Sequence, residues 1–159
     1  MPGAQASRMF RTLGIAASGL SAQRLRMETI ATNVANAETT RTEAGGPYRR
    51  RVVEMASASG PFGDAIAAQR GGAAAAIPGV PGADGTGGVR VTAINEDPSE
   101  GALVYEPGHP DANADGYVRY PNVRVTDEMV DLMDARRLYE ANATVFQVAK
   151  SMLRQAIDI

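Results

Sequence analysis

Residues 7–37, SRMFRTLGIAASGLSAQRLRMETIATNVANA, decide the fold that this chain can adopt. Apolar residues recur in this stretch at alternating steps of three and four, at Phe10, Leu13, Ala17, Leu20, Met27, Ala31 and Val34, with Arg24 as a break. This spacing predicts a long amphipathic helix with one apolar seam. Gly14 and Gly19 lie inside it, and each costs about 1 kcal/mol relative to Ala. Either another helix approaches these glycines closely, or the helix frays there.

A second amphipathic helix is expected from about Asp127 to the C-terminus. Its apolar residues form two adjacent stripes, one at Leu132, Ala135, Tyr139, Phe146, Ala149, Leu153 and Ala156, the other at Leu138, Val145, Met152 and Ile159. This face is broader than a single two-stranded seam requires. Thr126 is predicted as the N-cap, and Asp127 and Glu128 favour the positive end of the helix dipole. Both helices would reach roughly 45–50 Å.

The middle of the chain has a different composition. Between Gly60 and Gly88, 20 of 29 residues are Gly, Ala or Pro, which is typical of a loop or linker. Short strands are expected on either side, at Tyr48–Met55, Gly88–Ile94 and Ala102–Tyr105. The predicted fold is therefore α+β and mainly α, with the terminal helices paired as an antiparallel coiled coil. Residues 1–40 and 126–159 would form the core domain, and residues 41–125 a small β-rich and loop region with low complexity at 60–88.

Composition excludes several classes of function. The 159 residues include no Cys and a single His, so disulfide scaffolds, Cys-ligated metals and chemistry that needs two histidines are ruled out. No run of 18 apolar residues occurs, so no membrane insertion is expected. Residues 13–20, after two arginines, are too short and too rich in glycine for a good signal peptide. Residues 1–58 carry eight Arg and four Glu (+4), whereas residues 59–159 carry eight basic and fourteen acidic residues (−6), an asymmetry that can steer assembly.

Three short motifs carry candidate chemistry, and each has a simpler interpretation. Residues 111–116 match the opening of a calcium loop, but Asn122 occupies the position of the bidentate carboxylate, which favours an ordinary turn. His109 with Asp111 and Asp115 lacks the partners of a metal or general-base site. The run Arg49–Arg51 favours a solvated strand edge over nucleic-acid binding, because the chain is acidic overall. No cofactor and no nucleic acid are expected.

The end of the first helix resembles the signature of the bacterial flagellar axial proteins, the rod and hook family, in which a helix closes in I-A-x-N-[IV]-A-N-x-x-T. The matching residues are Leu20, Ala22, Gln23, Ile30, Ala31, Asn33, Val34, Ala35, Asn36 and Thr39. Most members continue directly into a Pro-Gly-Tyr/Phe-Lys-like turn, whereas this chain first inserts residues 40–46. Later stretches, at 88–94, 104–110, 116–123 and 128–145, are similar to one proximal rod member. The resemblance covers roughly residues 8–58 and 88–159.

The resemblance implies a non-enzymatic building block of the basal-body rod that transmits torque in motility. It implies assembly in the periplasm with copies of itself and other rod proteins, and passage through the flagellar type III export apparatus without a cleaved signal peptide. The paired terminal helices would line the inner tube. The expected packing seam comprises Phe10, Leu13, Ala17, Leu20, Met27, Val34, Leu132, Leu138, Tyr139, Val145, Phe146, Met152 and Leu153. The alternatives are a secreted helical-hairpin adaptor and an enzyme that uses a metal at residues 109–115.

Overall fold

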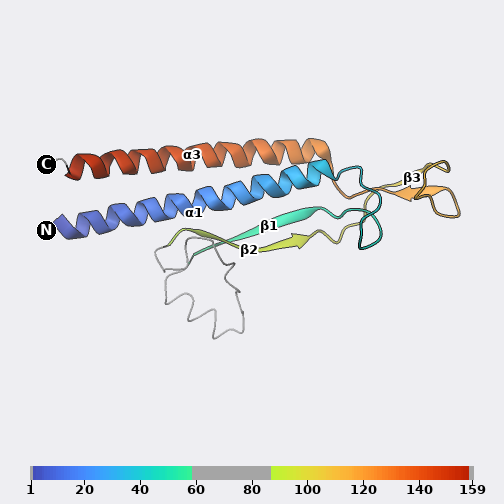
Figure 1. Ribbon diagram of the computed structural model, residues 1–159, viewed down its shortest axis with the longest axis horizontal. Coiled ribbons are helices and arrows are strands. Elements are labelled where there is room, and N and C mark those ends of the chain that lie inside the picture. Colours follow the sequence, from blue (N-terminus) through green and yellow to red (C-terminus); the bar gives the residue numbers. More distant parts are fainter. Residues whose placement is uncertain (1, 59–86, 158–159) are drawn as a thin grey trace, which may run out of the picture.

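Two long helices dominate the structure, a computed structural model that describes residues 2–58 and 87–157. In chain order the elements are α1 (Pro2–Ala35), β1 (Arg51–Ser57), β2 (Val89–Glu96), β3 (Leu103–Tyr105), β4 (Tyr117–Arg119) and α3 (Val125–Ile157). The helices lie side by side and antiparallel, so both termini are at the same end of an elongated molecule (Figure 1). The prediction of a mainly helical α+β chain is confirmed. Most of the Gly/Ala-rich segment lies outside the described residues.

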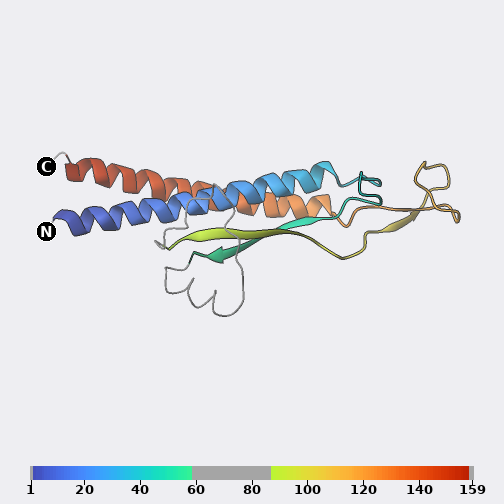
Figure 2. The same cartoon turned by 60° about the horizontal axis from the view of Figure 1, so that its bottom comes forward.

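Helix α1 is the middle layer, with α3 on one side and the β1–β2 hairpin on the other (Figures 1 and 2). The hairpin is antiparallel, with Arg51 opposite Glu96, Ser57 opposite Val89 and an irregularity between Glu54 and Met55. Both of its ends are attached to α1, because the Asn33 side chain binds the backbone of Arg51 and the Ser18 hydroxyl accepts a hydrogen bond from Val89 N–H. The fifteen residue steps of α1 from Ser18 to Asn33 span about 22 Å along the helix, which matches the length of the seven-residue strand β1.

The second hairpin, β3–β4, extends beyond the helix pair at the end away from the termini (Figure 1). Its strands pair antiparallel over three residues each, with Val104 opposite Val118. Val118 is buried at 1% exposure, whereas Leu103 and Tyr105 are more than half exposed. This hairpin therefore forms a thin arm with little core of its own.

Two buried contacts join the two helices. Gly19 of α1 lies against the Asn142 side chain of α3, and the fully buried Asn33 bonds to the fully buried Glu128. The two contacts are fourteen residues apart on each helix (33 − 19 and 142 − 128), so they keep one register over two heptads. Between and beyond them, Ala135 and Ala149 are buried at 0% and 7% exposure.

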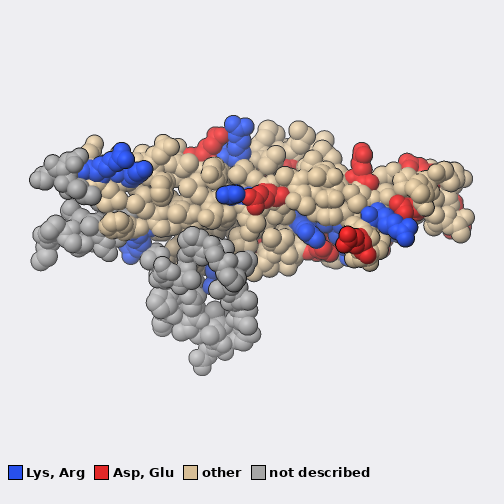
Figure 3. Space-filling model, in the orientation of Figure 1, with Lys and Arg blue, Asp and Glu red and all other residues tan. Residues whose placement is uncertain are grey.

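The large apolar side chains of α3 lie mostly away from this contact. Those that are exposed are Val125, Met129, Val130, Met133, Leu138, Val145, Val148 and Met152. Figure 3 shows that charged side chains are sparse along much of one face of the helix pair. A single chain thus buries Ala135 and Ala149 of α3 and leaves many of its Val, Leu and Met side chains exposed to solvent.

Several predicted details were wrong. Helix α3 begins at Val125, and the carbonyl of Arg124 accepts the first helical bond from Glu128 N–H, so Thr126 lies inside the first turn and is not the N-cap. The physical reason is that the Arg124 carbonyl already accepts a helical hydrogen bond, which brings Val125 and Thr126 into the first turn. The first strand begins at Arg51, three residues later than predicted, because the backbone N–H groups of Tyr48 and Arg50 bind the Thr39 carbonyl and Asn122 Oδ1 instead of a neighbouring strand. Strand β4 was not predicted at all.

The two glycines of α1 provide a matched test of the close helix approach. A Cβ at Gly19 would lie 2.8 Å from Asn142 Nδ2, whereas a Cβ at Gly14 meets nothing within 4 Å. We expect Gly14→Ala to raise the free energy of unfolding by about 0.5–1 kcal/mol through helix propensity alone. Gly19→Ala should fall below it by about 1–2 kcal/mol, because Asn142 must move. Urea titration followed by circular dichroism measures both, and an Asn142→Ala background should remove the difference. Equal effects of the two alanines in the parent background would contradict the close contact.

Candidate functional site

Asn33, near the end of α1, is the centre of a buried polar network. Its Nδ2 donates to the carbonyl of Arg51 and to Glu128 Oε2, both at 2.9 Å. Its Oδ1 accepts from the backbone N–H of Arg51 and from the Tyr48 hydroxyl, also at 2.9 Å. All four hydrogen-bonding positions of the amide are therefore used. One side chain thereby joins α1, the start of β1 and the first turn of α3.

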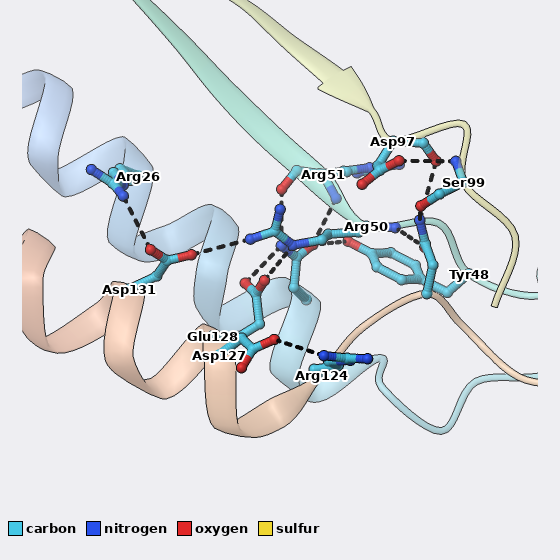
Figure 4. A network of polar contacts seen from close by, with 12 residues as sticks. Arg26, Tyr48, Arg50, Arg51, Asp97, Ser99, Arg124, Asp127, Glu128 and Asp131 are labelled. Carbon is cyan, nitrogen blue, oxygen red and sulfur yellow. Dashed lines mark hydrogen bonds and ion pairs between the residues drawn. The ribbon is translucent and has the colours of Figure 1, made fainter. Parts of the chain in front are cut away.

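Glu128 carries the network to a chain of alternating charges (Figure 4). Its side chain is fully buried and pairs with Arg50 Nε. Arg50 Nη2 also reaches Asp131 at 3.1 Å, and Asp131 in turn accepts from Arg26 Nη2 at 3.4 Å. Two arginines thus face two carboxylates, which meets the requirement that a buried charge be paired. Burial by itself would lower the pKa of Arg50, but its bond to Glu128 and the neighbouring carboxylates raise it above the ordinary value.

The backbone of Arg50 connects the same network to two loops. Its N–H donates to Asn122 Oδ1 at 2.7 Å, and its carbonyl accepts from Asp97 N–H at 2.7 Å. Asn122 Nδ2 donates in turn to the Ser99 hydroxyl at 2.9 Å. Hydrogen bonding to Ser99 lowers the pKa of Asp97, through the side chain first and the backbone second. The turn after β2 and the segment before α3 are therefore held against the start of β1.

The other motif residues divide between helix termination and packing. Asn36 Nδ2 donates to the carbonyl of Thr32, and Asn36 Oδ1 accepts from the Thr39 hydroxyl, which closes the end of α1. The carbonyl of Thr39 then accepts from Tyr48 N–H and directs the chain toward β1. Ala22 and Ile30 are buried; Leu20, Gln23 and Val34 are half-buried; Ala31 and Ala35 are exposed.

The arginine run is only partly the solvated strand edge that was expected. Arg49 and Arg51 are exposed, but Arg50 is half-buried between the two carboxylates of α3, so the prediction was wrong for this residue. Its physical reason is the buried Glu128, which requires a cation. The sequence offered no signal for this pair, because Glu128 next to Asp127 looks like any acidic first turn of a helix.

The stretch from Glu106 to Gly116 forms successive turns, as predicted. Backbone bonds run from His109 N–H to Glu106 and from Gly116 N–H to Asn113. Asn113 Oδ1 accepts from the N–H groups of Asp115 and Tyr117, and Asp111 accepts from the Thr40 hydroxyl at 2.8 Å. Within residues 2–58 and 87–157, no three His, Asp or Glu side chains gather as metal ligands. Neither α1 nor α3, as far as they are described, is apolar enough over its length to cross a membrane.

The expected seam residues occupy two environments. Leu13, Ala17, Leu20, Met27, Val34, Leu132, Tyr139, Phe146 and Leu153 are half-buried along the helix pair. Phe10, Leu138, Val145 and Met152 are exposed, with exposed fractions between 46% and 63%. The first group is partly covered within one chain, whereas the second remains open to a neighbour.

The chain is similar to known proteins along nearly its whole length. It is 42% identical to the flagellar basal-body rod protein FlgC of Bacillus subtilis, over 94% of this chain and 97% of the relative. The chain belongs to the FlgC family. FlgC of Borreliella burgdorferi is 41% identical over 95% of this chain and 97% of its own length, and FlgC of Salmonella typhimurium 37% identical over 91% and 92%. The family model "Flagella basal body rod protein" matches residues 13–41, and the model "Flagellar basal body rod FlgEFG protein C-terminal" matches residues 114–159.

Membership of the FlgC family makes the chain a structural subunit of the flagellar basal-body rod and not an enzyme. The relatives do not support the alternative of a secreted adaptor. The two matched ranges contain the two partners of the central contact, Asn33 in the first and Glu128 in the second. The contact between Asn33 and Glu128 therefore joins the two helices within a structural subunit, and is called the joint.

Removal of the central amide tests this joint. Asn33→Ala would leave Glu128, the Tyr48 hydroxyl and the backbone of Arg51 without their shared partner. We expect the free energy of unfolding to fall by about 2–4 kcal/mol, as measured by urea titration. Asn36→Ala is the control, because that amide bonds only within its own helix end and should cost about 1 kcal/mol or less. Equal losses for the two variants would contradict the central position of Asn33.

Alkaline pH tests the burial of Tyr48. Burial raises the pKa of its hydroxyl above 10.0, the nearby charges of Glu96 and Glu128 add to the rise, and Arg51 opposes it. The folded chain holds this proton more tightly than the unfolded chain, so the stabilising contribution is complete below about pH 10 and is lost as pH rises through the folded pKa. Tyr48→Phe should be less stable at neutral pH but lose less stability per pH unit above about pH 10. Thermal unfolding between neutral and alkaline pH measures this, with the exposed Tyr105→Phe as control. Parallel curves for Tyr48→Phe and the parent chain would show that Tyr48 does not contribute.

Proposed function

We propose that the chain is built into the rod through the outer face of its helix pair, which contacts copies of itself and other rod proteins and so helps to transmit torque. One observation carries this proposal. The most deeply buried residues of the α1–α3 contact include Gly19, Ala135 and Asn33, whereas many Val, Leu and Met side chains of α3 are exposed. Leu138, Val145 and Met152, spaced seven residues apart and each about half exposed, form one exposed apolar row, and such surfaces mark interaction sites. Burying each large side chain stabilises by roughly 1.5–3 kcal/mol, so a neighbour that covers several of them is held firmly.

We further propose that the helix pair is an antiparallel coiled coil and forms the core domain, residues 1–40 and 126–159, that lines the inner tube. The support is the seven-residue spacing of Glu128, Ala135, Asn142 and Ala149, all buried or half-buried toward α1. A seven-residue repeat corresponds to 3.5 residues per turn, less than the 3.6 of a straight α-helix, and so predicts a left-handed supercoil. Residues 41–125, which hold both hairpins, would face outward.

We infer that the packing seam is shared between the chain and its neighbours. Its half-buried members, such as Leu132 and Phe146, would complete their burial when a neighbouring helix lies alongside. Its exposed members, Phe10, Leu138, Val145 and Met152, would be covered only by that neighbour. The apolar face of α3 is broader than one partner helix can cover, which supports this division.

Helix α1 also bears on how the chain reaches the rod. We propose export to the periplasm through the flagellar export apparatus without removal of a signal peptide. Residues 13–20, the most apolar part of the N-terminal region, lie inside α1. Two of them have structural roles, since Ser18 binds Val89 and Gly19 admits Asn142. Cleavage after this stretch would remove both contacts, so mature rods should contain the uncleaved helix.

A pair of substitutions on α3 tests the assembly surface. Val145→Asp places a charge on an exposed apolar position, at 48% exposure, without disturbing the contact with α1. We expect the purified chain to keep its helical circular dichroism, while its incorporation into basal bodies and the motility of cells fall at least about tenfold. Gln147→Asp, an exposed polar position two residues away, is the control and should assemble normally. Normal assembly of Val145→Asp would show that this face is not an interface.

A further inference from the structure

We propose that the open edge of β3, in the arm, accepts an extended segment of another protein of the basal body, which pairs with it as a third strand. The partner is defined by its chemistry. It offers apolar side chains at alternate positions and a Lys or Arg that lies beside Glu106. This contact goes beyond the proposed function, because it is made by the arm and not by the exposed face of α3. It rests on that function only for the place where the chain is assembled.

The arm has little support within its own chain. Strands β3 and β4 lie against each other, but against neither helix and neither strand of the first hairpin. They extend beyond the helix pair (Figure 1). Val118 is buried, whereas Leu103, Val104 and Tyr105 are exposed by 38–62%. A two-stranded hairpin with such short strands is marginal in water, and a third strand is one of the additions that stabilise it.

The hydrogen-bond pattern shows which backbone groups of β3 are open. Glu106 N–H donates to the Gly116 carbonyl at 2.8 Å, which sets the alternation along the strand. Val104, two residues earlier, also faces β4, so the N–H and C=O groups of Leu103 and Tyr105 point away from it. No partner for these outward groups is found within the described residues. They form a regular edge to which an extended strand can bind.

The outer edge of β4, in contrast, is partly closed from within the chain. Tyr117 N–H donates to Asn113 Oδ1 at 2.8 Å, and the Tyr117 carbonyl accepts from Asn113 N–H at 2.9 Å. One asparagine thus occupies both outward backbone groups of Tyr117. Strand β3 has no such closure among the described residues, and its sequence, Leu-Val-Tyr, lacks the charged residues and prolines that keep free edges from pairing. The arm is therefore open on the β3 side.

The carboxylates near the end of β3 define the charge of the partner. Glu106 directly follows the strand and accepts a hydrogen bond from the Tyr120 hydroxyl at 3.0 Å. Within the part of the chain that the structure describes, no cation pairs with Glu106 or with Asp115 in the same turn. A Lys or Arg at the end of the added strand would neutralise Glu106. Two other carboxylates of this region are already paired, Asp111 with Arg41 and Glu100 with Arg119.

The same charges argue against a second copy of β3 as the added strand. Residues 96–118 contain no Lys and no Arg. Two β3 strands that paired edge to edge would therefore leave both copies of Glu106 without a cation. A different protein that supplies the cation satisfies both the open backbone groups and the carboxylate.

Amide hydrogen exchange compares the free chain with the assembled one. In the purified chain the N–H groups of Leu103, Tyr105 and Arg119 should exchange quickly, because all three point away from the hairpin. In basal bodies we expect exchange at Leu103 and Tyr105 to slow at least about tenfold, and exchange at Arg119, on the opposite edge, to change less than about twofold. Equal slowing at all three would indicate general burial and would overturn strand addition, as would no slowing at all.

Cross-linking from the same edge identifies the partner. Benzoylphenylalanine in place of Leu103, in motile cells, should link to an extended segment of another basal-body protein with alternating apolar residues and a Lys or Arg, as read by mass spectrometry. Replacement of Glu43, which is exposed in the turn at residues 42–46, is the control and should not give this product. Glu106→Lys should lower the yield about tenfold, and Glu in place of the partner's cation should restore it. A link only to a second copy, or a segment without this pattern, would overturn the proposal.

Proline substitutions at the two edges give a matched test. Leu103→Pro removes an outward N–H but leaves the bonds across the hairpin, and Arg119→Pro does the same at the opposite edge. Both variants should keep the circular dichroism of the parent chain and enter basal bodies, because the face of α3 is unchanged. The slow exchange at Tyr105 should be lost in Leu103→Pro and kept in Arg119→Pro. Loss in both variants, or in neither, would contradict pairing at β3. Failure of the parent chain to enter basal bodies would instead overturn the proposed function.

Discussion

The hydrogen bond between Asn33 and Glu128 is the contact on which the rest of the structure depends. Both side chains are fully buried, and their hydrogen-bond partners come from other elements of the fold. A buried carboxylate without a cation would be costly, so Glu128 requires Arg50, and Arg50 fixes the start of β1. From there Asn122 and Asp97 hold the two loops. The helices, the first hairpin and the root of the arm thus converge on one amide and one carboxylate.

We infer that this network contributes to the specificity of the helix register as well as to stability. The buried positions of α3 that face α1 include small residues with a spacing of seven, and small residues alone discriminate poorly between registers. A slip by one heptad would place Asn33 opposite Ala135 and Gly19 opposite Ala149, so the space would still be filled. The buried amide and carboxylate would then lose each other, at a cost of several kcal/mol. We infer that the polar network fixes the register that small side chains leave open.

Both helices, three of the four strands and the turn at residues 106–116 could be predicted from the sequence, because periodicity and turn residues are local signals. The role of Gly19 was foreseen as one of two alternatives, and the structure assigns close approach to Gly19 but not to Gly14. Asn33 was marked by its family resemblance, but its partners could not be predicted. Arg50 and Glu128 are 78 residues apart, and neither has a local pattern that distinguishes it from a solvated charge. Strand β4, three residues long, exists only through pairing with β3.

The distribution of side-chain size explains how one chain can be both a folded unit and a building block. If Leu and Val filled the α1–α3 contact, the monomer would bury its apolar area and leave a polar exterior. Here Ala135 and Ala149 are buried, Leu132 and Phe146 are half-buried and many other large apolar side chains of α3 are exposed, so part of the hydrophobic stabilisation is available only to an assembly. The joint at Asn33 lies near the arm, whereas Phe10 and Met152 lie toward the opposite end of the helix pair, far from that joint. The polar network at Asn33 fixes the arrangement of the elements at one end of the helix pair. The exposed apolar side chains along the rest of the pair are left for neighbours to cover. This division suits a subunit that must keep its shape while its neighbours complete its core.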